Sequence, residues 1–458
     1  MYLPAARGFD EYLGIPYSDD MGLARRTPCP GRSDQVVEEA MEPSDYVYVE
    51  EDNVHGDDIQ NLHDLNAQMK SGAMLPLVHQ SGGVTTTGEP TAHAGNTTVL
   101  EQPLDFSTLA PKYNQFVLDF IEKSKGGPFF LYMPFSHVHT TSGNQPQKQY
   151  ASCAHQNTSE RGAFGDALAE VDWIVGNVVD ALEKAGISEN TLTLFTGDNG
   201  PWMIQGLSGG SEGLLTGRYS QYWNTGKGST WEGGMHEAGF AHWPGTIKPY
   251  SRSAEVVGSL DLFPTASALA GVPLPTDRVY DGKDMSDVLL KDDGKSKHEV
   301  LFMYGGAGAD NGGPGAARMG PWKAYWATGP GLGGCDWPTC KKMTYPDESP
   351  LLFNVRIDPS EGIPMNPPQA KSPSGNSTGP TDGPAVPDEE VQAALKKIVA
   401  AWKVEVATFT RSSLISPPLL PGEACEGCTV AICCDGDPFV APAGKPPTCD
   451  CNGAPYGR

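Results

Sequence analysis

The clearest pattern along the chain is a set of stretches in which apolar side chains recur at the spacing of one helical face. Glycines close the first two stretches, at Gly126 and Gly186, as they do at many helix C-termini. The pattern predicts four helices, marked by Tyr113, Phe116, Val117, Phe120 and Ile121, by Phe164, Leu168, Val171, Val175, Val178 and Leu182, by the segment Leu260–Leu269, and by Val391, Leu395, Ile398 and Trp402.

Continuous apolar runs of strand length lie between these helical stretches. Phe129–Met133 is bounded by prolines, Leu192–Thr196 follows the break at Gly186, and Phe240–Trp243 comes next along the chain. Runs that are apolar at every position are typical of strands buried on both faces, as in a parallel sheet. Because helices and such strands alternate, we predict an α/β fold with a mostly parallel central sheet and helices on both of its faces.

The length of the chain and the fading of this alternation predict two domains. With 458 residues the chain is long for a single core. Residues 8–100 have little periodicity, which indicates loops with short elements, and the alternation weakens beyond Tyr280. We expect a large domain over residues 1–300 and a smaller α+β domain over residues 301–458. A loop rich in Pro, Gly and Ser at 360–387 and a cysteine-rich tail at 425–451 belong to the second domain.

The strongly acidic composition restricts the partners. Lys and Arg number 32 against 56 Asp and Glu, a formal net charge of -24. Such a surface repels the phosphate backbone, so we expect no nucleic-acid partner. The same charge disfavours anionic substrates at a distance. A site for an anion therefore needs its own local positive charge from Lys, Arg, His or a metal ion.

The cysteines and glycosylation sequons indicate an oxidising compartment. Six of the ten cysteines lie in the tail, namely Cys425, Cys428, Cys433, Cys434, Cys449 and Cys451. A zinc cluster is one interpretation, but no histidine follows Cys434, and adjacent cysteines among Pro and Gly favour disulfides of undetermined connectivity. Asn-x-Ser/Thr sequons at Asn96, Asn157 and Asn376 point to the same compartment.

The first residues do not have the features of a secretory leader. Residues 1–7 offer neither a charged n-region nor an apolar h-region, so either the protein is cytosolic or its beginning is missing. The tail favours the second explanation, with a secretory-pathway location that is lysosomal or extracellular. No apolar run approaches the roughly 20 residues that span a bilayer, so we expect no membrane span.

Polar residues at the ends of the predicted strands are the candidates for chemistry, since ligands bind at the carboxyl ends of parallel strands. His137 and His139 follow the first run, where they can also be purely structural. Asp198 and Asn199 follow the second. An Asx pair between glycines is often only a turn, but its oxygens are also the ligands that Ca²⁺ or Mg²⁺ prefers. Lys227, between Gly226 and Gly228, is either in a plain surface loop or able to approach an anion closely.

Seven segments follow one another in a fixed order: Gly8–Ser18, Phe129–His139, Phe164–Asp166, Phe195–Pro201, Gly226–Gly228 with Trp231–Gly234, Ser259–Thr265 and Pro350–Asn354. With the Ile432–Cys434 tail, they resemble the arylsulfatase A branch of the sulfatase family from the first residues to the last. The resemblance implies an alkaline-phosphatase-like α/β domain, a smaller C-terminal domain with a short antiparallel sheet, and hydrolysis of sulfate monoesters.

The resemblance also implies roles for single residues. Asp198 and Asn199 match ligands of a divalent ion, usually calcium, with magnesium as the alternative. His139 and Lys227 match catalytic residues that contact the sulfate or the ester oxygen, and Ser18 matches a substrate contact. Metal and lysine together would neutralise the anion that the acidic surface repels. We therefore expect Asp198, Asn199, His139 and Lys227 to lie close together.

Other family motifs are absent. Sulfatases carry an Asp-Asp pair, a Cys-x-Pro-Ser-Arg motif and a Lys-x-His pair upstream of the segment that matches Gly8–Gly14, and none of them precedes Gly8 in this sequence. Cys29 begins a partial match in the wrong place. His236 also stands where the family usually has arginine. We expect the formylglycine nucleophile, made from the motif cysteine by the formylglycine-generating enzyme, to belong to a missing N-terminal segment. The 458 residues alone should then have no appreciable sulfatase activity.

Three functional hypotheses remain open at this point. The first is a sulfuric ester hydrolase that acts on a small sulfated lipid, sugar or phenol. The second is a catalytically inactive, sulfatase-like secreted glycoprotein that keeps the fold and part of the metal site. The third is a hydrolase of the same superfamily that cleaves phosphate or phosphonate esters, because without the nucleophile motif the choice of ester depends on the resemblance.

Overall fold

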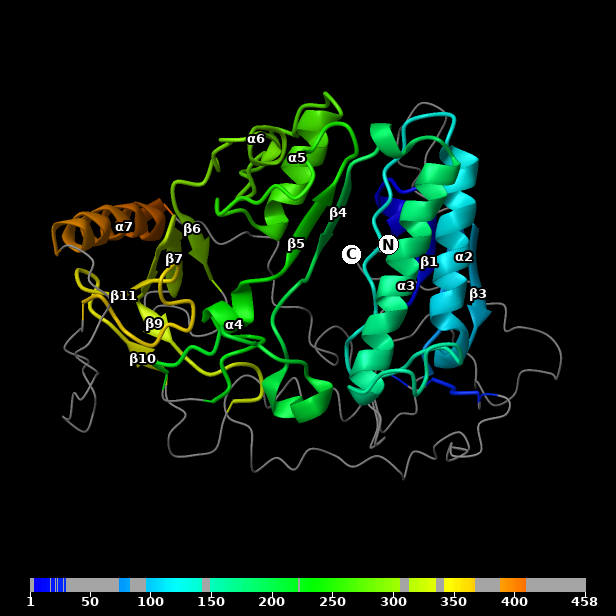
Figure 1. Ribbon diagram of the computed structural model, residues 1–458, viewed down its shortest axis with the longest axis horizontal. Coiled ribbons are helices and arrows are strands. Elements are labelled where there is room, and N and C mark those ends of the chain that lie inside the picture. Colours follow the sequence, from blue (N-terminus) through cyan, green and yellow to red (C-terminus); the bar gives the residue numbers. More distant parts are fainter. Residues whose placement is uncertain are drawn as a thin grey trace, which may run out of the picture. The chain divides into compact units, whose positions relative to one another are not determined.

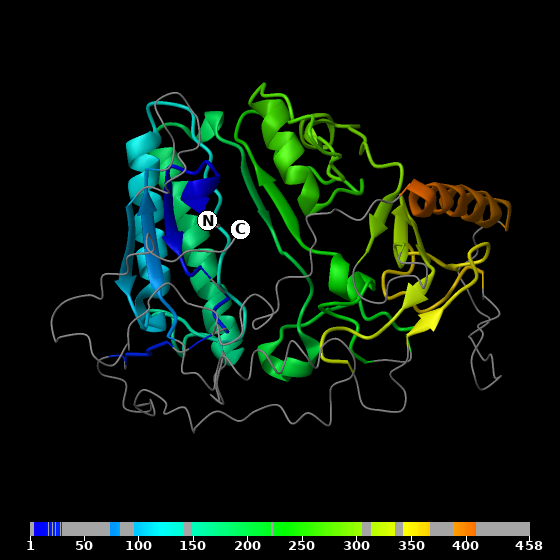
Figure 2. The ribbon, with the colours of Figure 1, turned by 180° about the vertical axis from the view of Figure 1, so that it is seen from behind.

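The computed structural model in Figures 1 and 2 describes a large part of the chain in two compact units. Unit 1 is formed by the described residues up to Gly186, and unit 2 by those from Ile187. The described residues are 4–16, 18–20, 22, 24–27, 29, 74–82, 96–141, 149–220, 223–304, 313–334, 342–366 and 388–408. The domain boundary expected at residue 300 stays a prediction.

Unit 1 combines a small antiparallel sheet with two long helices. The sheet has the order β1-β2-β3, with β1 at Glu11–Gly14, β2 at Leu77–Ser81 and β3 at Asn96–Glu101. In Figures 1 and 2 the two helices, α2 (Phe106–Ser124) and α3 (Gly162–Lys184), lie side by side. A short 3₁₀ helix, Pro4–Arg7, precedes the sheet. The sheet was not predicted, because residues 8–100 show no clear alternation of apolar and polar positions.

The two helices confirm the prediction from apolar spacing. The side chain of Asp105 caps α2 by accepting a hydrogen bond from the Ser107 backbone N–H at 2.9 Å. The chain leaves α3 through Gly186, whose φ of 70° lies in the left-handed region that glycine adopts most readily. The apolar face of α2 contributes to a core of Leu75, Leu77, Leu104, Phe106, Leu109, Tyr113 and Tyr150.

The segment Phe129–Met133 differs from the prediction, because it belongs to no strand of the described sheets. Phe130 is 63% exposed and Tyr132 is 64% exposed, so the run is not buried on both faces. Ring contacts hold it instead: the Phe129 ring packs edge-on against Phe120 of α2, with centroids 5.8 Å apart. An apolar run indicates burial but does not specify a hydrogen-bonding partner, and the prediction of a core strand here was wrong.

Unit 2 begins with a two-stranded sheet and several short helices. Strand β4 (Thr193–Thr196) pairs with β5 (Gly239–His242), and both lie where apolar runs predicted strands. Figure 1 labels the helices α4 (Glu232–Met235), α5 (Leu262–Leu269) and α6 (Ser286–Leu290). Three 3₁₀ helices lie at Ser188–Asn190, Met203–Ser208 and Ser259–Asp261.

The pairing of β4 and β5 is antiparallel, and so is every strand pair in the described sheets. The parallel order predicted for the central strands was therefore wrong for the strands described. The prediction assumed that a crossover helix returns the chain to the start of the next strand. Between β4 and β5 the chain instead turns back through the 3₁₀ helix Met203–Ser208 and the single turn of α4.

The last part of unit 2 is a four-stranded antiparallel sheet covered by one helix. Its order is β11-β8-β7-β6, with β6 at Leu301–Met303, β7 at Ala316–Met319, β8 at Trp322–Tyr325 and β11 at Leu351–Asn354. A two-stranded sheet of β9 (Ala327–Thr328) and β10 (Met343–Thr344) extends it. Helix α7 (Asp388–Thr408) is the helix predicted from Val391, Leu395, Ile398 and Trp402.

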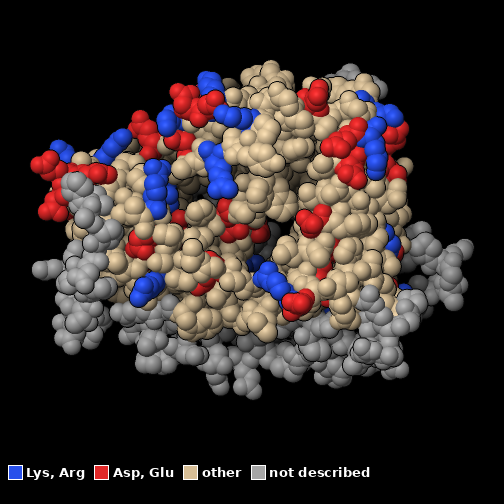
Figure 3. Space-filling model, in the orientation of Figure 1, with Lys and Arg blue, Asp and Glu red and all other residues tan. Residues whose placement is uncertain are grey.

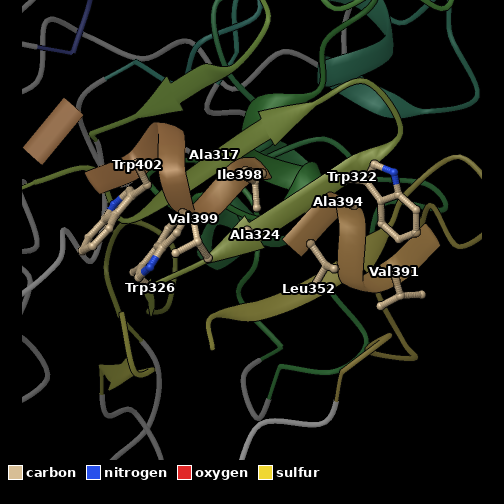
Figure 4. Close-up of a cluster of buried hydrophobic side chains, with 10 residues drawn as sticks. All are labelled: Ala317, Trp322, Ala324, Trp326, Leu352, Val391, Ala394, Ile398, Val399 and Trp402. Atoms are coloured by element: carbon tan, nitrogen blue, oxygen red, sulfur yellow. The ribbon is translucent and has the colours of Figure 1, made fainter. Parts of the chain in front are cut away.

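Helix α7 buries one face against this sheet, as Figure 4 shows. The rings of Trp326 and Trp402 are stacked, with centroids 4.5 Å apart and planes 4° from parallel. The cluster consists of Ala317, Trp322, Ala324, Trp326, Leu352, Val391, Ala394, Ile398, Val399 and Trp402. Truncating a buried tryptophan to alanine typically costs about 3–5 kcal/mol, so these rings hold the helix on the sheet.

The described helices carry no sign of a membrane span, since none is long and apolar enough to cross a bilayer. On the face seen in Figure 3, acidic and basic side chains are interspersed among uncharged ones. No single basic surface dominates that view, which agrees with the excess of acidic residues in the composition.

Candidate functional site

The turn that follows β4 carries the first candidate residues, Asp198 and Asn199. The Asn199 backbone N–H donates to Oδ1 of Asp198 at 2.8 Å, and the Asn199 side-chain amide donates to the Gly200 carbonyl at 2.9 Å. Asp198 is exposed and Asn199 is half-buried. Because the amide nitrogen is used as a donor, Asn199 can offer its amide oxygen to a cation beside the Asp198 carboxylate.

Gly200 fixes this turn against helix α4. The Gly200 N–H donates to the Gly234 carbonyl at 3.2 Å. A Cβ atom on Gly200 would lie only 1.8 Å from the Gly233 carbonyl oxygen, so no side chain fits unless the backbone moves. The position of α4 therefore sets the position of the Asp198–Asn199 turn.

The glycine-rich loop Gly226–Gly228 packs onto the residues that follow the same turn. The Lys227 N–H donates to the Pro201 carbonyl at 2.8 Å, and a Cβ on Gly226 would lie 2.1 Å from that same oxygen. The ammonium of Lys227 lies 5.3 Å from the centroid of the Trp202 ring, within range of a cation–π contact. The loop of Lys227 thus contacts the two residues, Pro201 and Trp202, that come shortly after Asp198 and Asn199.

Helix α4 is itself anchored by buried charges of the C-terminal sheet. Glu232 starts the helix, and its carboxylate accepts from the Lys323 ammonium at 2.7 Å and from the Arg318 guanidinium at 3.1 Å. Its backbone N–H donates to Glu361 at 2.8 Å. Burial raises the pKa of Glu232, but Lys323, His236 and Arg318 outweigh burial and hold that pKa far below its ordinary value. Glu232 is thus held as a carboxylate.

A further carboxylate, Glu237, lies beside the same turn. Its Oε2 would be 2.3 Å from a Cβ placed on Gly197, the residue before Asp198. Burial, and then the negative charge of Asp198, raise the pKa of Glu237. Two carboxylates that repel each other in this way concentrate negative potential where a cation would bind.

In unit 1, His139 lies against a buried carboxylate that the sequence did not mark. Nδ1 of His139 is 3.2 Å from Oδ1 of Asp19 and 2.9 Å from the Thr140 carbonyl oxygen. Asp19, Asp20 and His139 can place one donor atom each within 4.8 Å of one another. Burial raises the pKa of Asp19, and the contact with His139 opposes that rise only in part. Ser18 directly precedes this pair of acids.

A second buried acid in unit 1, Glu170 of α3, has several partners. Nε2 of His137 lies 3.0 Å from Oε2 of Glu170, and the Ser152 backbone N–H donates to both carboxylate oxygens, at 3.0 and 3.1 Å. Burial raises the pKa of Glu170, but the hydrogen bonds from His137 and Ser152 hold it below its ordinary value. The predicted histidine pair is therefore split, with His137 on Glu170 and His139 on Asp19.

Asp166 and a disulfide hold the loop that precedes α3. The carboxylate of Asp166 accepts from the backbone N–H groups of Asn157, Thr158 and Ser159 at 2.7 to 2.9 Å. Cys153, in the same loop, forms a disulfide with Cys29. A cysteine in a disulfide has no thiolate, so Cys29 is not available as a nucleophile in this state.

The outcomes for the predicted site residues fall into three groups. Asp198, Asn199 and Lys227 lie on neighbouring loops of unit 2, whereas Ser18 and His139 belong to unit 1, and the assembly of all of them into one site stays a prediction. The sequon residues Asn96 and Asn157 are exposed, which leaves glycosylation a prediction. Outside the described residues lie Asn376 and the tail cysteines Cys425, Cys428, Cys433, Cys434, Cys449 and Cys451.

Comparison with known proteins gives matches along most of the chain. The sulfatase family model matches residues 91–272, and the model for the C-terminal region of aryl-sulfatase matches residues 296–375. Human arylsulfatase G is 30% identical over 448 residues, which cover 94% of this chain and 72% of that protein. Rat steryl-sulfatase is 36% identical over 290 residues, which cover 59% of this chain and 47% of that protein.

A solved structure shows the same fold. The PsFucS1 sulfatase from Pseudoalteromonas sp. aligns over 89% of this chain and 67% of its own, with a TM-score of 0.60 and 23% identity. At that identity the likeness bears on the fold alone. The matched part of dog arylsulfatase G amounts to 61% of its length, so the chain spans between about half and three quarters of these curated relatives.

Proposed function

The chain belongs to the sulfatase family, and from that premise we propose that the protein is a sulfuric ester hydrolase that cleaves sulfate monoesters. The observation that carries the proposal is the packing of the Lys227 loop on Pro201, two residues after Asn199, through the bond from Lys227 N–H to the Pro201 carbonyl. An acidic protein that binds an anion needs a local cationic site, and these loops supply one lysine and two residues that suit a cation.

The donor chemistry of the turn fits a hard divalent ion. Asp198 and Asn199 would hold it through a carboxylate and an amide oxygen, with Glu237 adding negative potential, and calcium is the ion we propose, with magnesium as the alternative. When bound, such an ion withdraws charge from a sulfate oxygen. Lys227 would hold the sulfate anion and stabilise negative charge that develops on the leaving oxygen.

The remaining roles follow from the family. We propose that His139 contacts the ester oxygen as a proton donor and that Ser18 contacts the substrate. Formylglycine is the proposed nucleophile, formed by the formylglycine-generating enzyme. The 458 residues contain no Cys-x-Pro-Ser-Arg sequence, and Cys29 is bonded to Cys153, so we assign the nucleophile to none of them. We therefore expect the chain of 458 residues to bind sulfate esters without turning them over.

The disulfide between Cys29 and Cys153 supports a secretory-pathway protein, lysosomal or extracellular, because disulfides persist in oxidising compartments. Exposure of Asn96 and Asn157 is compatible with their glycosylation. The substrate class we propose is a small sulfated lipid, sugar or phenol.

Equilibrium binding of 4-nitrophenyl sulfate in calcium buffer, followed by isothermal titration calorimetry, tests the proposal. A hydrogen bond to a charged group is worth about 1.5–3 kcal/mol, so Lys227→Ala should weaken binding by about 10-fold or more. Asp198→Asn should remove the dependence on calcium. Lys248→Ala is the matched control, because its exposed side chain lies elsewhere in unit 2 and should leave binding unchanged.

Two results would replace the proposal with another hypothesis. Tighter binding of 4-nitrophenyl phosphate than of the sulfate ester, with the same dependence on Lys227, would identify a phosphate ester hydrolase. Binding of neither ester would identify a sulfatase-like glycoprotein without catalytic function. Release of 4-nitrophenol by the unmodified chain would contradict our statement that none of its residues is the nucleophile.

A further inference from the structure

The Oδ2 atom of Asp19, in unit 1, is buried without a hydrogen-bonding partner among the described residues. Asp19 is 4% exposed, and while its Oδ1 faces His139 Nδ1 at 3.2 Å, its Oδ2 has no partner among the described residues. Leaving a buried polar atom unsatisfied typically costs about 1–3 kcal/mol, and more for a charged one. Such an atom in a native protein calls for an explanation, and a bound ion is one.

The neighbouring acid shows what a satisfied carboxylate looks like in the same unit. Glu170 is fully buried, and both of its oxygens accept from Ser152 N–H, with His137 and His155 at 3.0 and 3.4 Å. Burial alone therefore does not explain the unpaired oxygen of Asp19. The difference is the second acid, Asp20, which places another negative group beside Asp19 where Glu170 has donors.

The donor atoms around Asp19 match the coordination sphere of a metal ion. Asp19, Asp20 and His139 can each offer one donor atom, and these atoms lie within 4.8 Å of one another. Ligands of one zinc ion, each bound at about 2.0–2.2 Å, lie roughly 3–4 Å apart, so a small movement of these side chains brings the three donor atoms onto one ion. Protein sites with three ligands leave a position for water or a small anion.

The imidazole determines which ions fit. Ca²⁺ and Mg²⁺ take oxygen ligands, whereas imidazole with carboxylates suits Zn²⁺ and its neighbours in the first transition series. Asp19, Asp20 and His139 thus differ in kind from Asp198 and Asn199, which offer oxygen atoms alone. One protein can therefore select different ions with its two sets of residues.

We propose that Asp19, Asp20 and His139 form a site for a divalent transition-metal ion, with zinc as the probe, made by residues of unit 1 alone. The unpaired Oδ2 of Asp19 and the convergence of three donors carry the inference. The site shares His139 with the proposed hydrolysis, but zinc binding is measured without an ester, so either proposal can fail without the other.

Zinc binding to metal-free, non-reduced protein, measured by competition with a chromogenic chelator, tests the site. Asp19→Asn and Asp20→Asn keep the side-chain shape, and each should weaken zinc binding by at least about 10-fold. His139→Ala should do the same, and calcium should not compete. The matched controls are Asp10→Asn, an exposed acid just before β1, and Asp198→Asn, and both should bind zinc as the wild type does.

Cobalt provides a second readout that identifies the ligands. Bound Co²⁺ should show the visible bands of a site with oxygen and nitrogen ligands, without the intense thiolate band that the cysteines would give, and Asp19→Asn should abolish those bands. Unchanged zinc affinity in folded Asp19→Asn and Asp20→Asn would overturn the proposal. A thiolate band, or loss of zinc in Asp198→Asn alone, would also overturn it and assign the metal elsewhere.

Discussion

Two buried carboxylates, Glu232 in unit 2 and Asp19 in unit 1, have opposite surroundings. Glu232 accepts from Lys323 and Arg318, which together place two positive charges on one carboxylate. Asp19 lies against His139 and has the acid Asp20 as a neighbour, and its Oδ2 has no hydrogen-bonding partner among the described residues. The pKa of Glu232 is accordingly low and that of Asp19 is raised by burial.

This difference distinguishes a carboxylate that stabilises the fold from one that can belong to a binding site. A buried acid whose partners are all within the protein is fully used in holding the fold, and Glu232 does so by fixing α4, on which Gly200 and the Asp198–Asn199 turn rest. A buried acid that lacks a partner weakens the fold, and such groups are characteristic of functional sites. The comparison therefore predicts large stability effects at Glu232 and its partners, and small ones at Asp19.

The largest effect is expected for Lys323→Met. The Lys323 side chain is fully buried, and removing its ammonium leaves Glu232 and Glu361 close together with less positive charge. Breaking a buried ion pair on one side typically costs about 3–5 kcal/mol. Denaturant unfolding followed by tryptophan fluorescence measures the loss. Lys397→Met, on the exposed face of α7, is the control and should change stability by less than about 0.5 kcal/mol. A loss below about 1 kcal/mol for Lys323→Met would remove the basis of the comparison.

The next effect is expected for the disulfide that holds unit 1. Replacing both Cys29 and Cys153 by alanine releases a covalent link across 124 residues of sequence, and losing such a link typically costs about 2–4 kcal/mol. Thermal unfolding should show a lower midpoint for the double variant than for the wild type. The reductant dithiothreitol should shift the wild type toward the variant. Equal midpoints for the two proteins without reductant would show that the link adds nothing to the stability of unit 1.

A smaller effect is expected for Glu170→Gln, and it should depend on pH. The folded-state pKa of Glu170 lies below its unfolded value, so its carboxylate stabilises the fold above the ordinary pKa of about 4.3 and loses this contribution as the pH falls through the folded value. We expect Glu170→Gln to lose about 1–3 kcal/mol at neutral pH and to show a shallower fall in stability below about pH 5. Glu183→Gln, exposed near the end of α3, is the control. Parallel stability–pH curves for Glu170→Gln and wild type would contradict the conclusion that the ionised Glu170 carboxylate stabilises the fold.

How much of the structure the sequence could predict depends on how far apart in the chain the interacting residues lie. Helices α2, α3, α5 and α7 depend on contacts between residues three and four apart, so apolar spacing was enough to find them. The glycines beside Lys227, from which the sequence indicated a close approach, do contact backbone, since a Cβ on Gly226 would lie 2.1 Å from the Pro201 carbonyl oxygen. The helical spacing and the glycine-rich loop can both be recognised within a short stretch of sequence.

Long-range partners were beyond the reach of the sequence. Lys323 and Glu232 are 91 residues apart, and nothing in either segment indicates the other. The disulfide joins cysteines 124 residues apart, and spacing does not determine pairing. Asp19 and Asp20 look like two surface acids until His139 is placed beside them. The strand expected at Phe129–Met133 failed for the same reason, because an apolar run does not name its hydrogen-bonding partner.

The smallest change in stability is expected for Asp19→Asn, and this variant tests most directly how Asp19 differs from Glu232. In metal-free protein the substitution replaces a charged group that has an unpaired buried oxygen by a neutral one of the same shape, so stability should change by less than about 1 kcal/mol, or rise. Denaturant unfolding in the presence of a chelator measures this, beside the same substitution with zinc added. A ligand that binds only the folded state raises stability with its concentration, so zinc should stabilise the wild type and leave Asp19→Asn unchanged. If Asp19→Asn instead lost several kcal/mol without metal, Asp19 would be a structural acid like Glu232, and the contrast between the two carboxylates would disappear.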